Sequence, residues 1–188
     1  MTYREKNLQI RPINEADCTL FPKLFAEQGW TKPSELFEKY LQEQTEKTRY
    51  VRVAEVNGVP CGYVTLVPLA AEGPFRAVLP EVVDFNVLEA YQEHGIGSAL
   101  FDAVETLAVT ALAADKLSLG VGLHAGYGPA QRMYVKRGFI PDGSGVWYQN
   151  QPAIPYSECC NDDELVLYMV KELLSANTKN QFLDTLSQ

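Results

Sequence analysis

The sequence lacks any long run of apolar residues. Across 188 residues, no window approaches the roughly 18 consecutive apolar residues that indicate a membrane-spanning helix. The first segment, MTYREKNLQIRP, is polar and charged, without the apolar centre of a secretory signal peptide. We therefore expect a cytoplasmic protein with no membrane partner.

Positive charge is also scarce. The chain has 16 Lys and Arg residues against 24 Asp and Glu residues, a formal net charge of −8. Binding to nucleic acid or to an anionic membrane requires a basic face, so we expect neither partner. An acidic balance suits a cationic substrate, but it is more commonly the ordinary surface of a soluble protein.

Cysteine and histidine are few and poorly spaced for metal binding. The cysteines are Cys18, Cys61, Cys159 and Cys160, and the histidines are His94 and His124. No CxxC pair is present, and two adjacent cysteines suit neither an ordinary disulfide nor a zinc site. We expect free thiols in a reducing compartment and no metal.

Apolar residues are abundant enough for one compact core. With 46% hydrophobic content, residues 1–171 are predicted to form one domain, and residues 172–188 a polar C-terminal helix or tail. The predicted strands cover 8–13, 50–56, 59–67, 81–88, 116–123, a segment from Phe139, and 164–170; the predicted helices follow Asn14 and Pro33 and cover 95–114 and 126–137. This order indicates a mixed α/β domain.

Turn residues mark the connections. Asn57-Gly58 separates two β-type segments, which is a strong signal for a hairpin because both residues tolerate positive φ. Residues 141–163 are rich in Pro, Gly, Asn and Asp and are predicted to form one long loop. A loop of that length in a compact domain is often functional.

The stretch YQEHGIGSALF, residues 91–101, places two glycines ahead of a helical segment. A strand, a glycine turn and a helix together can bind an anion, because N–H groups in a first helical turn lack intrahelical partners. A P-loop would need a lysine where Ser98 stands, and a dinucleotide fingerprint would need a glycine at Leu100. What remains is Q-x-x-G-x-G, which a purely structural turn would also satisfy.

Several segments together resemble the GNAT N-acetyltransferase superfamily. They are the QEHGIG loop, the IRP segment followed by Asp17, the AEVNGVPCGYVTL hairpin, the AQRMYVKRGF helix and strand, and the ELVLYMV strand. The resemblance implies a central mixed, mostly antiparallel sheet of about six to seven strands flanked by about four helices. It also implies transfer of an acetyl group from acetyl-coenzyme A to a primary amine, by direct attack through a tetrahedral intermediate.

The resemblance also implies how the donor is held. Main-chain N–H groups of the glycine loop would bind the pyrophosphate, and the main chain of the preceding strand would pair with the pantetheine arm. The implied cofactor-binding residues are Phe85, Val87, Gln92, Glu93, His94, Gly95, Ile96, Gly97, Ser98, Tyr127, Ala130 and Lys136. The sequence departs from the family at Tyr127, where many members have asparagine, and at Glu89, which replaces a proline.

Three residues are candidates for catalysis. Tyr134 occupies the position of the superfamily's frequent general acid, where a phenol near pKa 10 would assist a thiolate near 8.5. Glu81 and Asp84, on the strand before the loop, are the best carboxylates for deprotonating the amine. The alternatives are a core tyrosine and solvent-facing strand carboxylates.

The acceptor side is predicted from the long loop. Its aromatic residues Trp147, Tyr148 and Tyr156, with the acidic run 162–164, suit an ammonium or guanidinium group, or they form an ordinary covering loop. A small-molecule amine is the expected partner, and a homodimer is compatible with the sequence. Two alternatives remain: a coenzyme A-binding sensor or partner-binding module, and an enzyme that acetylates protein N-termini or lysines.

Overall fold

The computed structural model describes residues 7–173, which form two compact units. One unit contains the chain up to Val67 together with Val83–Thr106, and the other contains Pro68–Val82 and the chain from Leu107 onward. From residue 174 on, the helix or tail expected over 172–188 lies outside the described residues.

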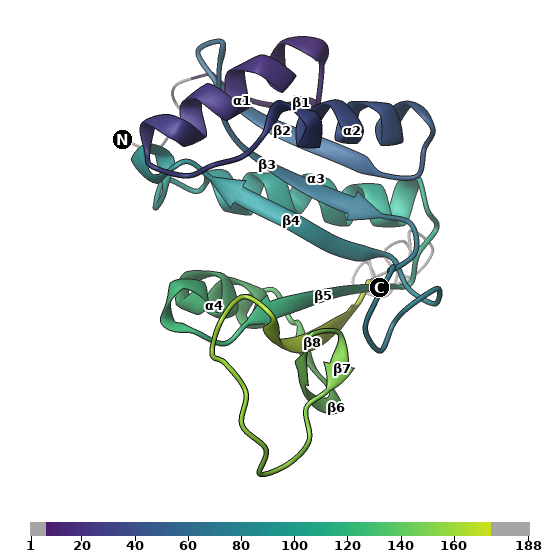
Figure 1. The fold of residues 1–188 in the computed structure, drawn as a ribbon. Coiled ribbons are helices and arrows are strands. Elements are labelled where there is room, and N and C mark those ends of the chain that lie inside the picture. Colours follow the sequence, from purple (N-terminus) through teal and green to yellow (C-terminus); the bar gives the residue numbers. More distant parts are fainter. Residues whose placement is uncertain (1–6, 174–188) are drawn as a thin grey trace. The chain divides into compact units, whose positions relative to one another are not determined.

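Strands and helices are mixed along the chain, as the α/β prediction requires (Figure 1). The strands are β1 Leu8–Pro12, β2 Tyr50–Val56, β3 Val59–Val67, β4 Glu81–Val87, β5 Lys116–Gly122, β6 Ile140–Tyr148, β7 Gln151–Pro152 and β8 Leu165–Glu172. The helices are α1 Glu15–Glu27, α2 Ser34–Thr45, α3 Ile96–Thr110 and α4 Gly128–Lys136. The strand order is β1-β2-β3-β4-β5-β8-β6-β7. The predicted mixed, mostly antiparallel sheet is thus confirmed, with the two-residue β7 as an additional strand.

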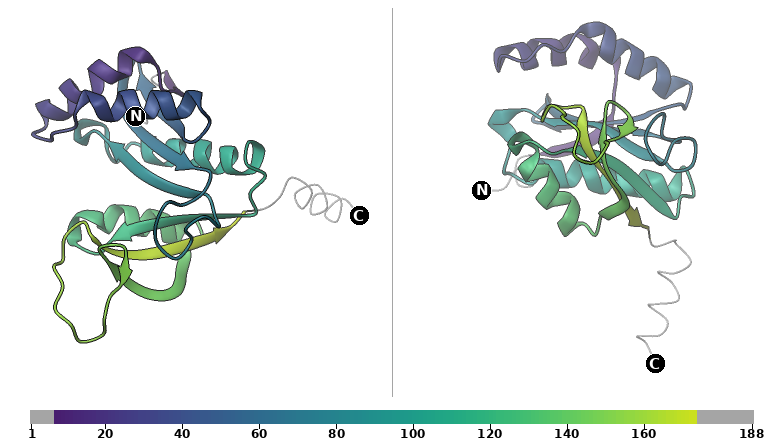
Figure 2. Two further views of the ribbon diagram at one scale, coloured as in Figure 1. Left: turned by 45° about the vertical axis from the view of Figure 1, so that its right-hand side comes forward. Right: turned by 60° about the horizontal axis from the view of Figure 1, so that its bottom comes forward.

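The first unit is built on the predicted hairpin. β2 and β3 pair antiparallel from Val56↔Val59 onward, and Asn57 and Gly58 adopt positive φ values of 52° and 81°. Helices α1 and α2 cover one face of these strands, and α3 covers the other (Figure 2). The core under α1 and α2 is largely aromatic, with Phe21, Phe37 and Tyr63 fully buried.

Helix α1 begins where the sequence predicts. The side chain of Asn14 accepts from the backbone N–H of Asp17, and the carboxylate of Asp17 accepts from the backbone N–H of Asn14. This reciprocal capping satisfies N–H groups that a helix start otherwise leaves unpaired. Arg11 of β1 also binds the buried carboxylate of Asp17, at 2.6 Å, which ties the helix to the strand.

The second unit is organised around β5. The first residues of β4 run parallel to β5, with Glu81 opposite Ser118, and β8 runs antiparallel to β5 on its other side. Helix α4 follows a 3₁₀ turn, Ala125–Tyr127, and ends at Lys136; Gly138, two residues further on, has a φ of 88°, which confirms its predicted role as the C-terminal glycine.

The predicted loop over residues 141–163 is wrong in its first part. β6 continues to Tyr148, pairs with β8 and turns back through β7, so only the residues after Pro152 form the connection to β8. Pairing is interrupted between Pro141 and Val146, where Gly143 and Gly145 have φ values of 90° and 85°. The glycines that suggested a loop therefore form a bulge within a strand.

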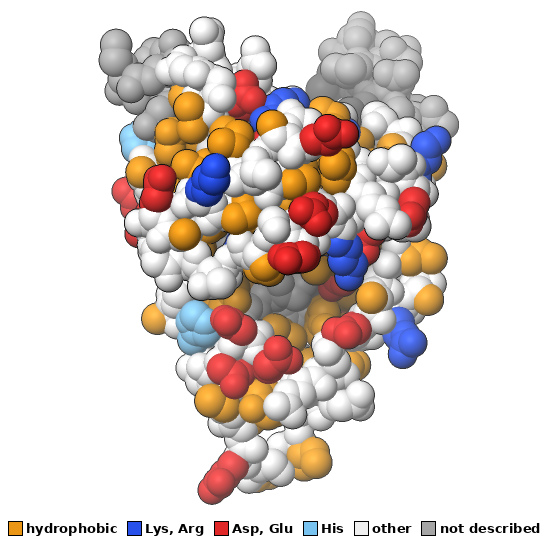
Figure 3. All heavy atoms as spheres, turned by 45° about the horizontal axis from the view of Figure 1, so that its top comes forward, with side chains coloured by type: hydrophobic (Ala, Val, Ile, Leu, Met, Phe, Trp, Pro, Cys, Tyr) orange, Lys and Arg blue, Asp and Glu red, His pale blue; other side chains and the backbone are white. Residues whose placement is uncertain are grey.

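The surface of the described residues shows no continuous basic patch on the face drawn in Figure 3, where Lys and Arg side chains lie singly among carboxylates. All four cysteines are free thiols; Cys18 and Cys61 are buried. Within residues 7–173, no helix combines the length and apolar character needed to cross a membrane.

Candidate functional site

The predicted phosphate loop joins β4 to α3 in the first unit. The chain leaves β4 at Val87, passes a 3₁₀ turn, Glu89–Tyr91, and reaches α3 through exposed residues 92–95. The side-chain amide of Gln92 donates to the carbonyl of Val87 at 3.0 Å, and Nδ1 of His94 contacts the carbonyl of Gln92. These contacts fix the path of the loop ahead of the helix.

The two glycines have different roles. Gly95 has a φ of +82°, and a Cβ there would meet no atom within 4 Å, so the backbone conformation is what requires glycine. A Cβ at Gly97 would lie 3.2 Å from Cζ of Phe85, so this glycine allows the helix to pack against β4. Phe85 in turn packs edge-on against Phe101 of α3.

The loop lies where a helix N-terminus can attract an anion. It precedes a helix of 15 residues with no acidic residue in its first turn, and the positive end of such a helix attracts an anion. Buried Ile96 anchors the helix start, while Gly95 and Ser98 are exposed. The backbone of the loop is therefore accessible to a ligand, and the buried side chain of Ile96 fixes the start of the helix.

Asp84 lies at the centre of a hydrogen-bonded cluster in the first unit. Its Oδ2 accepts from the hydroxyls of Tyr63, at 2.6 Å, and Tyr40, at 3.0 Å, and its Oδ1 accepts from the amide of Asn86 at 2.6 Å. The ammonium of Lys32 lies 3.4 Å from both carboxylate oxygens. The carboxylate is thus surrounded by donors, which leaves little acceptor capacity for the proton of an incoming amine.

The two tyrosines of this cluster remain donors. Burial, followed by the charge of Asp84, raises the pKa of both Tyr63 and Tyr40 above the ordinary value of 10.0. Lys32 reinforces the arrangement, because its ammonium lies 5.4 Å from the centre of the Tyr63 ring and 5.5 Å from that of Phe25. Asp84 therefore has the environment of a structural acceptor.

Glu81 has the opposite environment. It is the first residue of β4, in the second unit, and only 9% of its surface is exposed. Burial, helped by the negative charge of Glu72, raises its pKa from 4.5 to about 7. Within residues 7–173, no donor forms a hydrogen bond with its carboxylate. A buried, unpaired carboxyl group that titrates near neutrality is a candidate general base.

Tyr134 lies on α4 in the second unit and is 6% exposed. Its ring centre is 6.0 Å from that of Phe139, on the residue that follows Gly138. Burial is the main reason that the pKa of Tyr134 is raised above 10.0, with a smaller contribution from Tyr127. The phenol therefore stays protonated over the neutral range and can donate a hydrogen bond.

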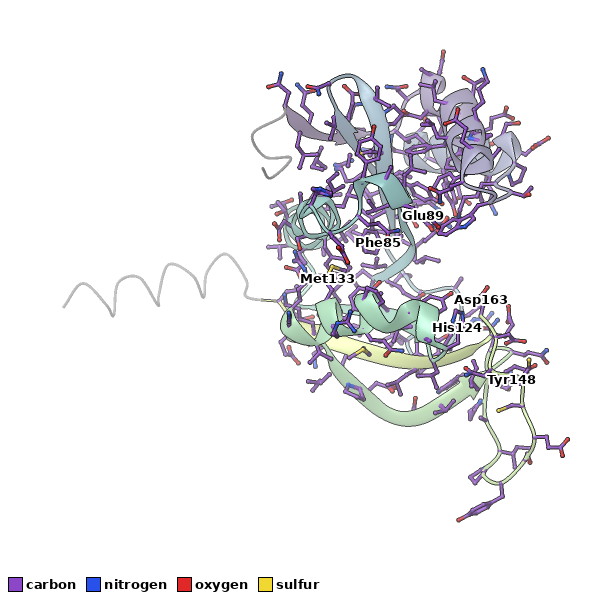
Figure 4. The ribbon with its side chains drawn as sticks, turned by 90° about the vertical axis from the view of Figure 1, so that its left-hand side faces the viewer. Phe85, Glu89, His124, Met133, Tyr148 and Asp163 are labelled. Carbon is purple, nitrogen blue, oxygen red and sulfur yellow. The ribbon has the colours of Figure 1, made fainter. Side chains whose placement is uncertain are left out.

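A further cluster joins the start of α4 to the loop before β8 (Figure 4). Nε2 of His124 lies 3.0 Å from Oδ1 of Asp163, and the hydroxyl of Tyr127 donates to the same oxygen at 2.9 Å. Because Nδ1 of His124 accepts from the N–H of Gly126, Nε2 carries the proton donated to Asp163. The hydrogen bond from His124, and to a smaller extent that from Tyr127, holds the pKa of Asp163 below 3.8.

Sequence reasoning missed this cluster. It treated His124 only as a residue poorly spaced for metal binding, and it considered Asp163 only as part of an acidic run. The two positions are 39 residues apart, and no local pattern connects them. The cluster also accounts for Tyr127, whose ring lies over Gly122 so closely that a Cβ there would come within 2.3 Å of it. The hydroxyl of Tyr127 is therefore directed to Asp163.

The predicted acceptor aromatics do not form one group. Trp147, on β6, packs edge-on against Tyr168 with ring centres 5.5 Å apart, and its Nε1 donates to Ser144. Tyr148 ends β6 and is half-buried, whereas Tyr156 is fully exposed in the loop before β8. Two predicted cofactor-binding positions lie on α4: Ala130 is half-buried and Lys136 is exposed.

Residues 7–173 hold no group of three or more His, Cys, Asp or Glu residues arranged for a metal.

Comparison with known proteins matches the chain to one family. The model of the Acetyltransferase (GNAT) family matches residues 12–139. No curated protein matches the chain in sequence.

Solved structures share the fold at low sequence identity. Ribosomal-protein-alanine N-acetyltransferase from Brucella melitensis has a TM-score of 0.64 at 20% identity, covering 88% of this chain and 99% of its own. The protein yncA from Salmonella typhimurium, solved with its cofactor acetyl-CoA, has a TM-score of 0.62 at 19% identity, covering 88% and 94%. A chimera of spermidine N-acetyltransferase SpeG from Vibrio cholerae and hSSAT has a TM-score of 0.62 at 17% identity, covering 88% and 95%.

Proposed function

The chain belongs to the GNAT family of acetyltransferases, and we propose that it transfers an acetyl group from acetyl-coenzyme A to a primary amine by direct attack. The main support is Glu81, a buried and unpaired carboxyl group with a pKa of about 7. An ammonium must lose a proton before its nitrogen can attack, and a base that titrates near the working pH is the most effective acceptor. Of the two predicted carboxylates, Glu81 is the base in this proposal, and Asp84 is structural.

The donor is held by the glycine loop. Coenzyme A supplies the acetyl group as a thioester. The main-chain N–H groups of residues 93–98 bind its pyrophosphate in this proposal, since they lie at the N-terminal end of α3 with Gly95 in an open backbone conformation. The main chain of Phe85 and Val87 pairs with the pantetheine arm. The hydroxyl of Tyr127 takes no part, because it already donates to Asp163.

Tyr134 assists the departing sulfur. Its pKa, raised by burial, lies well above the pKa of about 8.5 of an ordinary thiol, so full transfer of the phenolic proton is uphill by more than about 2 kcal/mol. A hydrogen bond that stabilises the developing thiolate requires no such transfer. We therefore assign Tyr134 as a hydrogen-bond donor in the reaction.

A thiol-release assay tests the proposed function. Purified protein is incubated with acetyl-coenzyme A and, in turn, with small primary amines, amino acids and peptides that have free N-termini or lysines. Small amines should release free thiol, and Glu81→Gln should reduce the rate by about 100-fold without weakening coenzyme A binding. Tight coenzyme A binding without thiol release for any acceptor would instead support a sensor, and release with peptides alone would indicate a protein acetyltransferase.

A further inference from the structure

Strand register places Glu81 and two aromatic side chains on one face of the sheet in the second unit. Glu81 is opposite Ser118 on β5, and Gly120, two residues on, is opposite Tyr168 on β8. Paired residues share a face and alternate residues return to it, so Glu81 and Tyr168 project from the same side. Trp147 of β6 is opposite Val166 and joins that side too.

Ser118 and Gly120 are the residues of β5 that are paired with Glu81 and Tyr168 on this face. A Cβ at Gly120 would lie 3.2 Å from Cε1 of Tyr168, and a Cβ at Gly73, in the loop before β4, would lie 2.3 Å from its Cζ. Phe75 of the same loop meets the ring edge-on, with centres 6.5 Å apart. The Tyr168 ring is thus held on several sides by surroundings that are mostly apolar.

Three carboxylates act on this ring, and none has a cationic partner in the part of the chain that the structure describes. Burial, then the charges of Glu81, Glu72 and Asp142 in that order, raises the pKa of Tyr168 to about 12. No Lys or Arg among residues 7–173 forms an ion pair with any of the three acids. Glu81 itself is nine-tenths buried, without a donor, and interacts electrostatically with Glu72.

A buried acid beside further acids is unfavourable without a compensating positive charge. We infer that the face formed by Glu81, Glu72, Asp142, Tyr168 and Trp147 binds an acceptor with at least two positively charged nitrogens. This inference rests on the proposed function: Glu81 receives the proton of the reacting nitrogen, while Glu72, Asp142 and the aromatic rings bind the second ammonium. The acceptor class is therefore a linear diamine or polyamine.

The inference is tested with two amines of equal length. 1,4-Diaminobutane and n-butylamine differ in one terminal ammonium, so their kcat/KM values isolate the contribution of the second charge. The diamine should be preferred by about tenfold at low salt, and the preference should fall as salt is added. Glu72→Gln should lower kcat/KM for the diamine by about two- to fivefold more than it lowers kcat/KM for butylamine, because any change in Glu81 acts on both amines.

Glu158→Gln is the matched control, since Glu158 is also exposed and loses the same charge in the same unit. It should leave both amines unaffected. Equal kcat/KM values for the two amines, or an equal effect of Glu72→Gln on both, would overturn the inference while leaving the acetyltransferase proposal intact.

If neither amine is acetylated, calorimetric titration with 1,4-diaminobutane tests the site directly. Binding that Glu72→Gln weakens would support the site. No binding, or binding that Glu72→Gln leaves unchanged, would reject it.

Discussion

The hydroxyl of Tyr63 donates to Oδ2 of Asp84 across 2.6 Å, and Tyr40 donates to the same oxygen. This contact links the aromatic core under α1 and α2 to the middle of β4. It also separates the two strand carboxylates, which look equivalent in sequence. Asp84 is occupied by donors, whereas Glu81, three residues earlier, is buried and has no donor among residues 7–173.

Replacing Asp84 should mainly affect stability. Asp84→Asn places an NH2 group either against the hydroxyls of Tyr63 and Tyr40 or against the side-chain amide of Asn86, so at least one donor loses its acceptor. We expect the free energy of unfolding to fall by about 1–3 kcal/mol in urea titrations. Tyr63→Phe should be less harmful, and the double variant should lose less than the sum, because both changes break one contact. Unchanged stability with a lost pH dependence of kcat/KM would make Asp84 the base instead.

Replacing Glu81 should raise stability at high pH and abolish most activity. The folded-state pKa of about 7 lies above the ordinary value of 4.5, so the folded protein loses stability as pH rises through this interval. Glu81→Gln carries no charge and should be more stable than the wild type above about pH 7, by up to about 3 kcal/mol. Below about pH 4.5 the advantage should vanish.

Urea unfolding of both proteins at about pH 5 and about pH 8 measures this difference. In parallel, kcat/KM of the wild type should rise with pH and level off above about 7, and the variant should lack this rise. A variant less stable than the wild type at about pH 8 would show that the Glu81 carboxylate is compensated in the folded protein.

Removing the hydroxyl of Tyr134 should reduce turnover selectively. Tyr134→Phe keeps the ring that packs on Phe139 but deletes the donor. We expect kcat to fall by about 10- to 1000-fold, with coenzyme A affinity within about twofold of the wild type. Because the phenol is protonated throughout the neutral range, the shape of the pH profile should not change. Equal kcat values in the two proteins would remove Tyr134 from the mechanism.

The glycine loop can be tested at Gly95. Its φ of +82° disfavours a β-branched residue but tolerates asparagine, and neither side chain meets a neighbour at its Cβ. Gly95→Val should therefore weaken coenzyme A binding by about tenfold or more, while Gly95→Asn should weaken it by only about two- to threefold. Calorimetric titration with coenzyme A compares them. Equal affinities for both variants would show that the conformation of this loop does not determine binding.

Much of the fold was predictable because its signals are local. The Asn57-Gly58 hairpin, the Asn14 cap and the C-terminal Gly138 each depend on backbone preferences of one or two residues. The error over residues 141–148 has the same origin, since the glycines of a bulge and of a loop look alike until the partner strand is known.

The sequence by itself therefore determined the order of the main strands and helices, the presence of the glycine loop ahead of α3 and the family resemblance. Each of these depends on signals from residues that are close together along the chain. Only the tertiary structure showed that Glu81 and Asp84 have different environments, joined His124 to Asp163, and placed Tyr168 on the same face as Glu81. The physical reason is that burial, hydrogen-bond partners and neighbouring charges set the chemistry of a carboxyl group. Those neighbours come from distant strands, loops and helices.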